Sequence, residues 1–479
     1  MTIEKSFSNS VAWMAAGAWI EQAFNFAVFV ILARLLGAET IGLAAMAVSF
    51  LVLAASLVRE TFTEYLIAHK DPSKDDYNAV FWCLIALGIL LAVLMITLSK
   101  PIAAFYGEPE VASFLLALSP VVLMIALTAV PVAILRREMR FNILSIRAVA
   151  GVVIGGITGI ILALTGFGVW ALILQYLTLI AVNAALAWFA VDWRPGRPPS
   201  AAHLKEVAKF GTQVMGLRTA ELTATQGPLV MIGATLGATA LGQFSIAWRL
   251  IEIGSFLVVT PLRMTSQSAF AAILRTGKNA ADLLDKLLKT IALLALPAFI
   301  GLATLAPFVI PTIFGTGWDE AVPVLQILSA AGIFFCFEKV QQAYCLAAGR
   351  AGQVTLVTWA EAILGILLIW IFASYGIAAV AIVFSLRFYL LWPIRFKIVE
   401  NLGGGSLSDT LKTTLKPAII SLIMAAITLA ITQILALNPL LSLIIGTISG
   451  ALIFGLLTTL FMRDRLTLAI DLAKGEGAP

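Results

Sequence analysis

Runs of about twenty apolar residues recur along the whole 479-residue chain, separated by short polar or Gly/Pro-containing breaks. A helix needs roughly 20 apolar residues to cross a hydrocarbon core of ~30 Å, so each run is long enough to span a membrane. The composition agrees, because 61% of the residues are hydrophobic and only 12% are charged, against roughly 25% in soluble domains. A transmembrane barrel would instead show segments of about ten residues with alternating polarity, and the sequence has no such segments. We therefore expect an all-α polytopic membrane protein.

Reading the apolar runs between their breaks predicts fourteen transmembrane spans. They lie near 10–36, 41–68, 79–99, 111–133, 143–165, 168–190, 209–236, 241–265, 289–313, 321–347, 354–374, 377–398, 413–436 and 439–461. The first run is too long for a signal-peptide core and has no small-residue cleavage site after it. We expect it to remain as the first span.

The basic residues of the predicted loops are distributed unevenly. The odd-numbered connections hold only Arg34 and Lys100, whereas the termini and even-numbered connections hold twenty-three lysines and arginines. Arg395 is counted here with the connection after the twelfth span. Because cytoplasmic loops are enriched in Lys and Arg, both termini are predicted to face the cytoplasm. This bias accounts for the net charge of +5 without a nucleic-acid partner.

A short turn-like stretch is duplicated. LLGAETIG at 35–42 has a counterpart in TLGATALG at 235–242, each between two apolar runs. Aligned without gaps, residues 31–50 and 231–250 share five identical positions, including both glycines of the turn. Glycine permits a tight reversal and close packing. We predict that each stretch is the periplasmic corner joining the first two spans of a repeated unit.

A second likeness sets the length of the repeat. GFGVWAL at 166–172 resembles SYGIAAV at 374–380, so the repeat unit contains six spans. An even number of spans gives both halves the same orientation, related by an axis along the membrane normal. The sequence then predicts an N-terminal lobe at 1–198 and a C-terminal lobe at 199–400. Residues 401–479 add two spans and a short cytoplasmic tail.

Charged residues inside predicted spans are the candidate functional groups. Those at least two turns from a span end are Glu21, Arg218, Glu221, Arg249, Glu252, Glu361 and Arg387. Each would cost about 2.5–3.5 kcal/mol if it faced lipid at mid-helix, so they must face one another or a wet cavity. Two Arg/Glu pairs are spaced by three residues and share a helix face. Two interpretations stay open: structural ion pairs, or a hydrated cavity whose arginines hold an anionic head group and whose carboxylates carry a proton or cation.

Other charges lie nearer to span ends, where long side chains can reach water. We interpret them as anchors: Arg59, Glu60, Glu64, Arg263, Glu338 and Lys339. The segment RREMRFNILSIR at 136–147 is predicted to be a positive-inside anchor, with a loading surface for lipid phosphates as the alternative. Gly151, Gly155 and Gly159 repeat at four-residue spacing, which is typical of close helix packing.

The remaining candidate chemistry is sparse. Cys83, Cys336 and Cys345 lie in apolar runs and are interpreted as packing residues. His69 and His203 sit in different polar loops without ligand-like neighbours, so no metal site is expected. The sequence contains no G-x-x-x-x-G-K-[ST] phosphate loop and no catalytic triad or paired catalytic carboxylates. We expect no cofactor and no enzymatic activity.

Four patterns in order resemble one family: ILARLLGAETIGLAAMA, AILRREMRF, GFGVWAL and PLVMIGATLGATALGQFSIAWRL. They are similar to bacterial polysaccharide repeat-unit flippases of the Wzx type, in the multidrug, oligosaccharidyl-lipid and polysaccharide exporter superfamily. The resemblance covers roughly residues 10–400. That family often has an acidic residue shortly before the IG-x-x-LG motif, whereas this chain has the uncharged TQGP at 225–228. Ion-coupling residues are therefore not carried over from the family.

The resemblance implies a two-lobed, twelve-helix core with two extra helices in the bacterial inner membrane. Such proteins turn over undecaprenyl-diphosphate-linked oligosaccharides for O-antigen, capsule or exopolysaccharide assembly, and the resemblance implies a polymerase and chain-length proteins as partners. Under alternating access, we expect the diphosphate to bind Arg218, Arg249 and Arg387. The ion-coupling candidates are Glu21, Glu221, Glu252 and Glu361. The alternatives are a gradient-driven multidrug exporter, a peptidoglycan-precursor flippase, and a non-transporting scaffold of a polysaccharide assembly complex.

Overall fold

The computed structural model describes residues 3–62, 65–66, 71–277 and 279–474, and every regular element in these ranges is helical. The elements are α1 (Ile3–Thr61), α3 (Lys74–Tyr106), α4 (Glu110–Arg137), α5 (Phe141–Leu164), α6 (Val169–Phe189), α7 (Ala201–Arg275), α8 (Ala281–Phe314), α9 (Ala321–Ala347), α10 (Ala351–Phe372), the short η1 (Ala373–Tyr375), α11 (Ile377–Glu400), α12 (Leu407–Leu435), α13 (Pro439–Phe461) and α14 (Arg463–Lys474). Within the described ranges, twelve of them are long and apolar enough to cross a membrane. The predicted all-α membrane class is confirmed.

Two helices, α1 and α7, each cover two predicted spans. Each is broken by one glycine with non-helical dihedral angles, Gly37 (φ 78°, ψ 176°) in α1 and Gly237 (φ 81°, ψ −178°) in α7. Residues other than glycine rarely adopt such positive φ values. Both breaks fall inside the predicted duplicated turns. The total of fourteen spans stays a prediction.

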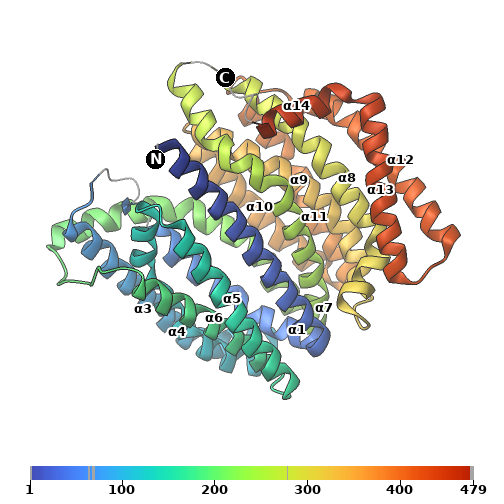
Figure 1. The fold of residues 1–479 in the computed structure, drawn as a ribbon. Coiled ribbons are helices and arrows are strands. Elements are labelled where there is room, and N and C mark those ends of the chain that lie inside the picture. Colours follow the sequence, from blue (N-terminus) through green and yellow to red (C-terminus); the bar gives the residue numbers. More distant parts are fainter. Residues whose placement is uncertain (1–2, 63–64, 67–70, 278, 475–479) are drawn as a thin grey trace. The chain divides into compact units, whose positions relative to one another are not determined.

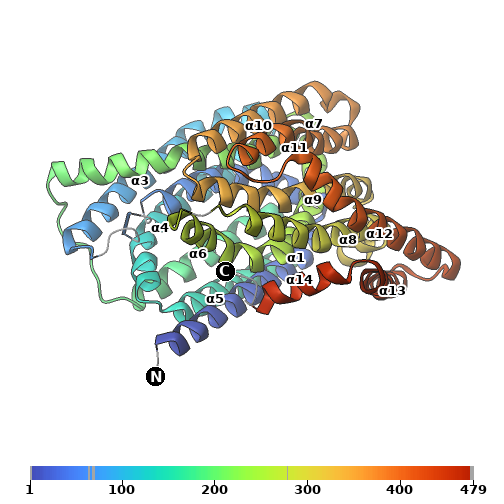
Figure 2. The same cartoon turned by 90° about the horizontal axis from the view of Figure 1, so that it is seen from above.

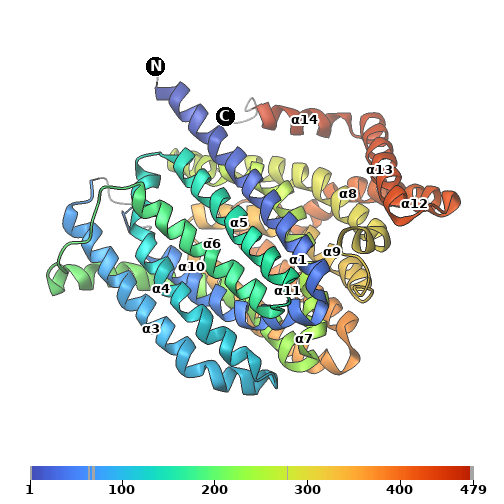
Figure 3. The same cartoon turned by 60° about the horizontal axis from the view of Figure 1, so that its bottom comes forward.

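The chain reverses direction at the break in α1. In the first part of α1, Gly17 packs against Ser145 at the start of α5. After the second part of α1, the Leu66 carbonyl accepts a hydrogen bond from Arg137 at the end of α4. Because only residues 138–140 separate α4 from α5, Gly17 and Leu66 lie at the same end of these two helices. Figure 3 shows the first part of α1 running beside α5, which it contacts.

The break in α7 is also a reversal. A Cβ atom on Gly233 would lie 3.2 Å from the side chain of Leu241. In a continuous helix, residues eight apart are separated by about 12 Å along the axis. The contact therefore requires the chain to fold back between these two residues.

The two turns pack against each other reciprocally. A Cβ on Gly42 would lie 1.7 Å from the carbonyl oxygen of Ala238, and one on Gly242 would lie 1.9 Å from the carbonyl oxygen of Ala38. Such mutual contact between equivalent residues is the mark of a local two-fold relationship. The likeness between the two sequence stretches therefore has a counterpart in space.

The chain divides into two compact units, Met1–Gly242 (unit 1) and Gln243–Pro479 (unit 2). In unit 1, α3 packs on α4, α5 packs on α6, and α1 contacts both α4 and α5. Figure 1 shows α5 and α6 side by side in green. A Cβ on Gly155 would lie 2.9 Å from the Gln175 carbonyl oxygen of α6, and Gly151 and Gly159 make similarly close approaches. The predicted close packing along these glycines is confirmed.

The first part of α7 belongs to unit 1. Gly211 packs against the ring of Phe62, and Tyr65 meets Phe210 edge to face at 5.5 Å between ring centroids. The division between the compact units therefore falls within α7, after Gly242. The functional lobe boundary at residues 198/199 stays a proposal.

In unit 2, α8 packs on α9, α12 and α13, and α11 packs on α9 and α10. Figure 2 shows α12, α13 and α14 in red beside α8. The tail after the last predicted span forms a further helix, α14. Its Ala469 packs on a small apolar cluster made by Leu293, Ile420 and Met462.

Two helices begin with the same capping arrangement. Before α3, the Ser73 hydroxyl accepts from the Asp76 backbone N–H at 3.2 Å, and the Asp76 carboxylate accepts from the Ser73 N–H at 2.7 Å. Ser406 and Asp409 repeat these bonds at the start of α12. Each box satisfies backbone donors that have no partner within the helix.

Candidate functional site

Two ion pairs lie inside membrane-length helices, at the spacing noted in the sequence. Arg218 Nη1 is 2.9 Å from Glu221 Oε2 in unit 1, and Arg249 Nη1 is 3.3 Å from Glu252 Oε2 in unit 2. The predicted pairing within each helix is confirmed. The arginine side chains are nevertheless 33% and 31% exposed. Exposure of a charge to hydrocarbon is costly, so these surfaces require polar surroundings.

Glu21 of α1 lies in unit 1 near a group of arginines. Arg147 of α5 and Arg59 of α1 are close enough to attract its carboxylate. Arg59 and Arg136 are in turn close enough to repel Arg147, whose Nε atom is buried without a hydrogen-bond partner among the described residues. The basic 136–147 segment therefore brings positive charge toward the interior of unit 1.

Unit 2 contains a buried cluster of four charged side chains on three helices. They are Glu338 of α9, Glu361 of α10, and Arg387 and Arg395 of α11, and none is more than 6% exposed. Arg395 Nη2 lies 3.0 Å from Glu338 Oε1 and 2.7 Å from Glu361 Oε2. Its Nε donates to Glu361 Oε1 at 2.9 Å. One guanidinium therefore joins two carboxylates from different helices.

Arg387 occupies the same region and makes no direct ion pair with the described residues. Its guanidinium carbon lies 4.1 Å from the ring centroid of Phe384 and 4.5 Å from that of Phe388. Gly365 of α10 faces it, and a Cβ there would lie 2.4 Å from Nη1. The Nε and Nη1 atoms are buried and have no hydrogen-bond partner in the described part of the chain. Arg387 is thus held by aromatic faces and by the charge of the cluster.

Two interpretations made from the sequence are wrong. Glu338 does not anchor a span end, because it is buried against Arg395. Arg395 is not a loop charge, because it lies inside α11 and is also buried. The burial of Glu338 could have been predicted from its position, because it lies more than two turns from the end of α9. The neighbouring Lys339 places its Nζ 4.5 Å from the ring centroid of Phe335.

Some sequence candidates lie elsewhere or are not described. Glu64 and His69 fall outside the described residues, as do the side chains of Glu60 and Arg263. Cys336 and Cys345 are buried free thiols, in agreement with their interpretation as packing residues.

His203, at the start of α7, contacts α3 in unit 1. Its Nε2 is 3.0 Å from Asp76 Oδ1, and the Tyr65 hydroxyl donates to the same oxygen at 3.3 Å. The Asp76 carboxylate therefore caps α3 and also binds the first part of α7.

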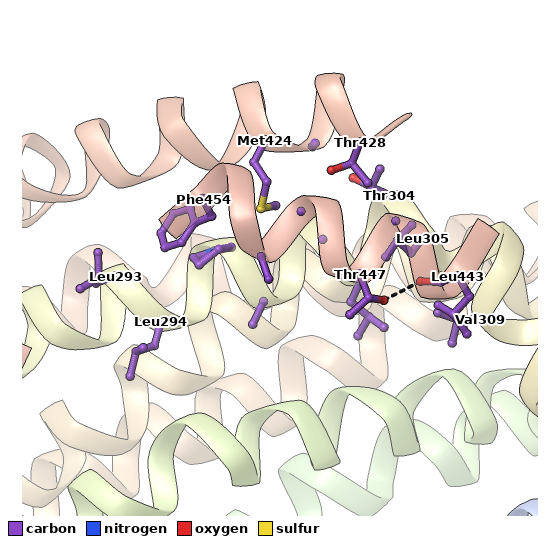
Figure 4. A pocket seen from close by; sticks show the side chains of 18 residues that line it. Leu293, Leu294, Thr304, Leu305, Val309, Met424, Thr428, Leu443, Thr447 and Phe454 are labelled. Atoms are coloured by element: carbon purple, nitrogen blue, oxygen red, sulfur yellow. Dashed lines mark hydrogen bonds between the residues drawn. The ribbon is translucent and has the colours of Figure 1, made fainter. Parts of the chain in front are cut away.

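An apolar pocket of about 460 Å³ lies in unit 2 between α8, α12 and α13. Figure 4 shows Leu293, Met424 and Phe454 around it, together with the hydroxyl groups of Thr428 and Thr447. Three glycines, Gly301, Gly446 and Gly450, also line the space. The pocket has the size and chemistry for a segment of hydrocarbon chain.

The sequence is similar to those of bacterial polysaccharide biosynthesis proteins. A family model described as polysaccharide biosynthesis protein matches residues 31–323. The succinoglycan biosynthesis transport protein ExoT of Rhizobium meliloti is 24% identical over 326 residues, which cover 68% of this chain and 66% of that protein. The teichuronic acid biosynthesis protein TuaB of Bacillus subtilis is 26% identical over 301 residues, 60% of each chain. The lipopolysaccharide biosynthesis protein WzxC of Escherichia coli is 23% identical over 335 residues, 70% of this chain and 68% of WzxC. The matched region spans just under two thirds of the length of ExoT and less of TuaB.

Solved structures share the fold. The lipid II flippase MurJ in an inward closed conformation matches with a TM-score of 0.77, covering 95% of this chain and 99% of MurJ at 16% identity. An inward-facing multidrug resistance MATE family transporter of the same exporter superfamily matches with a TM-score of 0.59, covering 80% and 94% at 18% identity. At these identities the likeness concerns the fold alone.

Proposed function

We propose, since this chain belongs to the polysaccharide biosynthesis protein family of membrane flippases, that it translocates undecaprenyl-diphosphate-linked oligosaccharide repeat units across the bacterial inner membrane. The units would feed O-antigen, capsule or exopolysaccharide assembly, with a polymerase and chain-length proteins as partners. In this proposal the chain crosses the membrane fourteen times with both termini in the cytoplasm. Its lobes are residues 1–198 and 199–400, and residues 401–479 are an addition.

The observation that carries the proposal is the partial exposure of Arg218 and Arg249 inside membrane spans. Each arginine pairs with the neighbouring carboxylate, and about a third of its side chain is exposed. Arginine donors in a planar fork suit phosphate oxygens, with which they form strong charge-assisted hydrogen bonds. These two residues are therefore the proposed ligands of the diphosphate.

Arg387, the third proposed ligand, is buried, whereas Arg218 and Arg249 are partly exposed. It is 1% exposed and stacked between aromatic rings, so a head group reaches it only when α10 and α11 move apart. Glu21, Glu221, Glu252 and Glu361 remain the proposed ion-coupling carboxylates. In this proposal transport follows alternating access, in which the site opens to one side of the membrane at a time, and these carboxylates bind and release the coupling ion.

The apolar pocket supports a lipid-linked substrate rather than a wholly soluble one. Its lining is mostly apolar, and Met424 and Phe454 contribute adaptable and bulky apolar surface. We propose that part of the polyprenyl tail occupies it.

The test is flipping by the purified protein in vesicles that contain a fluorescent polyprenyl-diphosphate N-acetylglucosamine as the lipid-linked probe. Arg218→Gln and Arg249→Gln should each slow flipping by about tenfold or more, because a hydrogen bond to a charged group contributes about 1.5–3 kcal/mol. Arg197→Gln, in the exposed segment before α7, is the matched control and should flip normally. Unchanged rates in both variants would reject the head-group assignment.

Two rivals share the fold of this chain and therefore need their own tests. A multidrug exporter, as the MATE likeness suggests, predicts increased drug susceptibility in a deletion strain. A lipid II flippase, as the MurJ likeness suggests, predicts that the deletion is lethal. A viable deletion strain with normal drug resistance and no surface polysaccharide supports the repeat-unit substrate. A non-transporting scaffold is rejected by flipping in vesicles that contain this protein alone.

A further inference from the structure

The cluster of Glu338, Glu361, Arg387 and Arg395 limits which ion can act there. Of the four carboxylate oxygens, three already contact Arg395: both oxygens of Glu361 and Oε1 of Glu338. Two carboxylates are balanced by two guanidiniums, so the cluster is neutral when all four are ionised. The cluster therefore has no net charge, and Arg395 already contacts all but one of its carboxylate oxygens.

A metal cation does not fit this arrangement. Hard cations bind where several oxygen ligands, including uncompensated carboxylates, surround one space. Here a resident guanidinium occupies that space, and Arg387 adds a second positive charge next to it. A proton needs only one oxygen and no coordination shell, so it is the ion that this cluster accepts without losing Arg395.

Arg387 gives protonation a structural consequence. It lies close enough to both carboxylates to feel their charge, yet its Nε and Nη1 atoms make no hydrogen bond within the described chain. When one carboxylate becomes neutral, two guanidiniums face a single negative charge in a buried site. An uncompensated buried charge is strongly unfavourable, so the packing of α11 on α9 and α10 must loosen and admit water.

We propose that Glu338 and Glu361 form a carboxylate dyad that exchanges a proton as the coupling ion of transport, with Arg395 as their shared partner and Arg387 as the charge that opens the site. This inference rests on the proposed flippase function. A proton from water on one side adds to a carboxylate oxygen of the dyad, converting COO⁻ to COOH. It leaves to water on the other side, which restores the neutral cluster.

Unpartnered polar atoms near the dyad provide places for the water that carries this proton. Gln341 is buried three residues after Glu338, and neither its Nε2 nor its Oε1 has a partner among the described residues. Trp392 Nε1, three residues before Arg395, is also buried and unpartnered in the described part of unit 2. Such atoms in a polar interior are commonly satisfied by ordered water. The other titratable groups that act on the cluster are Lys339 and Cys345.

The experiment measures flipping of the same fluorescent probe in vesicles under a pH gradient alone, a sodium gradient alone, or neither. One proton exchanged per substrate lets a one-unit pH gradient sustain a probe ratio between leaflets of up to about tenfold. The pH gradient should shift this ratio and the sodium gradient should not. Glu338→Gln and Glu361→Gln should flip the probe to a ratio near one under every gradient. The control Glu400→Gln, exposed at the end of the same bundle, should respond like the original protein.

The outcomes separate the inference from the function on which it rests. A shift driven by sodium, or a pH response that survives in Glu338→Gln/Glu361→Gln, overturns the proton dyad and leaves the flippase function intact. Absence of flipping by the unmodified protein under all gradients overturns the function itself. Glu361→Asp keeps a titratable group, so recovery of the pH response in this variant excludes misfolding as the cause of the loss.

Discussion

Gly42 approaches Ala238 so closely that a Cβ atom on the glycine would lie 1.7 Å from the alanine carbonyl oxygen. The equivalent pair, Gly242 and Ala38, makes the same contact with the roles exchanged. The two backbones therefore touch without any side chain between them. Each glycine follows a reversal at Gly37 or Gly237, so the duplicated turns form one small symmetric contact.

Gly42→Ala should destabilise this contact. The added methyl group has to displace the Ala238 backbone rather than a flexible side chain, and overpacking of this kind costs about 1–3 kcal/mol. The measurement is the free energy of unfolding in detergent micelles. Gly216→Ala is the matched control, because beyond the adjoining helix backbone no described atom lies within 4 Å of a new Cβ, so the change should be neutral or stabilising. Equal effects of the two substitutions would contradict the close contact.

Arg395→Gln should be among the most destabilising single changes in unit 2. It leaves two buried carboxylates facing each other without their shared guanidinium, and breaking a buried ion pair from one side costs about 3–5 kcal/mol. Chemical denaturation in micelles measures the loss. Lys397→Gln, two residues away in an exposed pair with Glu400, should change stability little. A triple variant that also carries Glu338→Gln and Glu361→Gln should recover part of the loss.

Filling the apolar pocket should impair handling of the lipid tail. Ala298→Phe places a ring in the space between α8, α12 and α13, which excludes a hydrocarbon segment. Photo-crosslinking with a diazirine-bearing polyprenyl diphosphate should fall severalfold, together with polymer output in cells. Ile434→Phe adds the same ring at an exposed position of α12 outside the pocket and serves as the control. Undiminished crosslinking in Ala298→Phe would place the tail elsewhere.

The two capping boxes allow the contact between α3 and α7 to be isolated. Asp76→Asn keeps a side-chain acceptor for its capping box but loses the negative charge that contacts His203 and Tyr65. A hydrogen bond to a charged group contributes about 1.5–3 kcal/mol, so this substitution should lower the free energy of unfolding by about that amount. Asp409→Asn makes the same substitution in the other capping box, at an exposed helix start. Unfolding measurements should show the larger loss for Asp76→Asn. A similar loss in both variants would mean that His203 and Tyr65 add nothing to stability.

The two copies of the second repeated stretch share a glycine turn but differ in the helices around it. Gly168 and Gly376, aligned by GFGVWAL and SYGIAAV, both have positive φ and precede α6 and α11. In this alignment Arg395 falls over Ala187, which is buried and apolar. The halves thus share turns while their interiors differ, with glycine packing between α5 and α6 and a charge cluster beside α10 and α11.

Features that depend on neighbouring residues were predictable from the sequence alone. The apolar runs predicted the helices, the duplicated glycines predicted the breaks at Gly37 and Gly237, and the three-residue spacing predicted the pairs Arg218–Glu221 and Arg249–Glu252. Each of these follows from local chain geometry, in which a helix brings residues three or four apart together and only glycine readily adopts positive φ.

The partners of distant charges were decided by the tertiary structure. Arg395 lies between Glu338 and Glu361 because three helices pack with these residues at one depth, and nothing in the sequence near Arg395 indicates either carboxylate. The allocation of the first part of α7 to unit 1 likewise depends on its contacts with Phe62 and Asp76. Helix propensity and hydropathy are local properties, whereas charge pairing and unit boundaries depend on which helix faces meet.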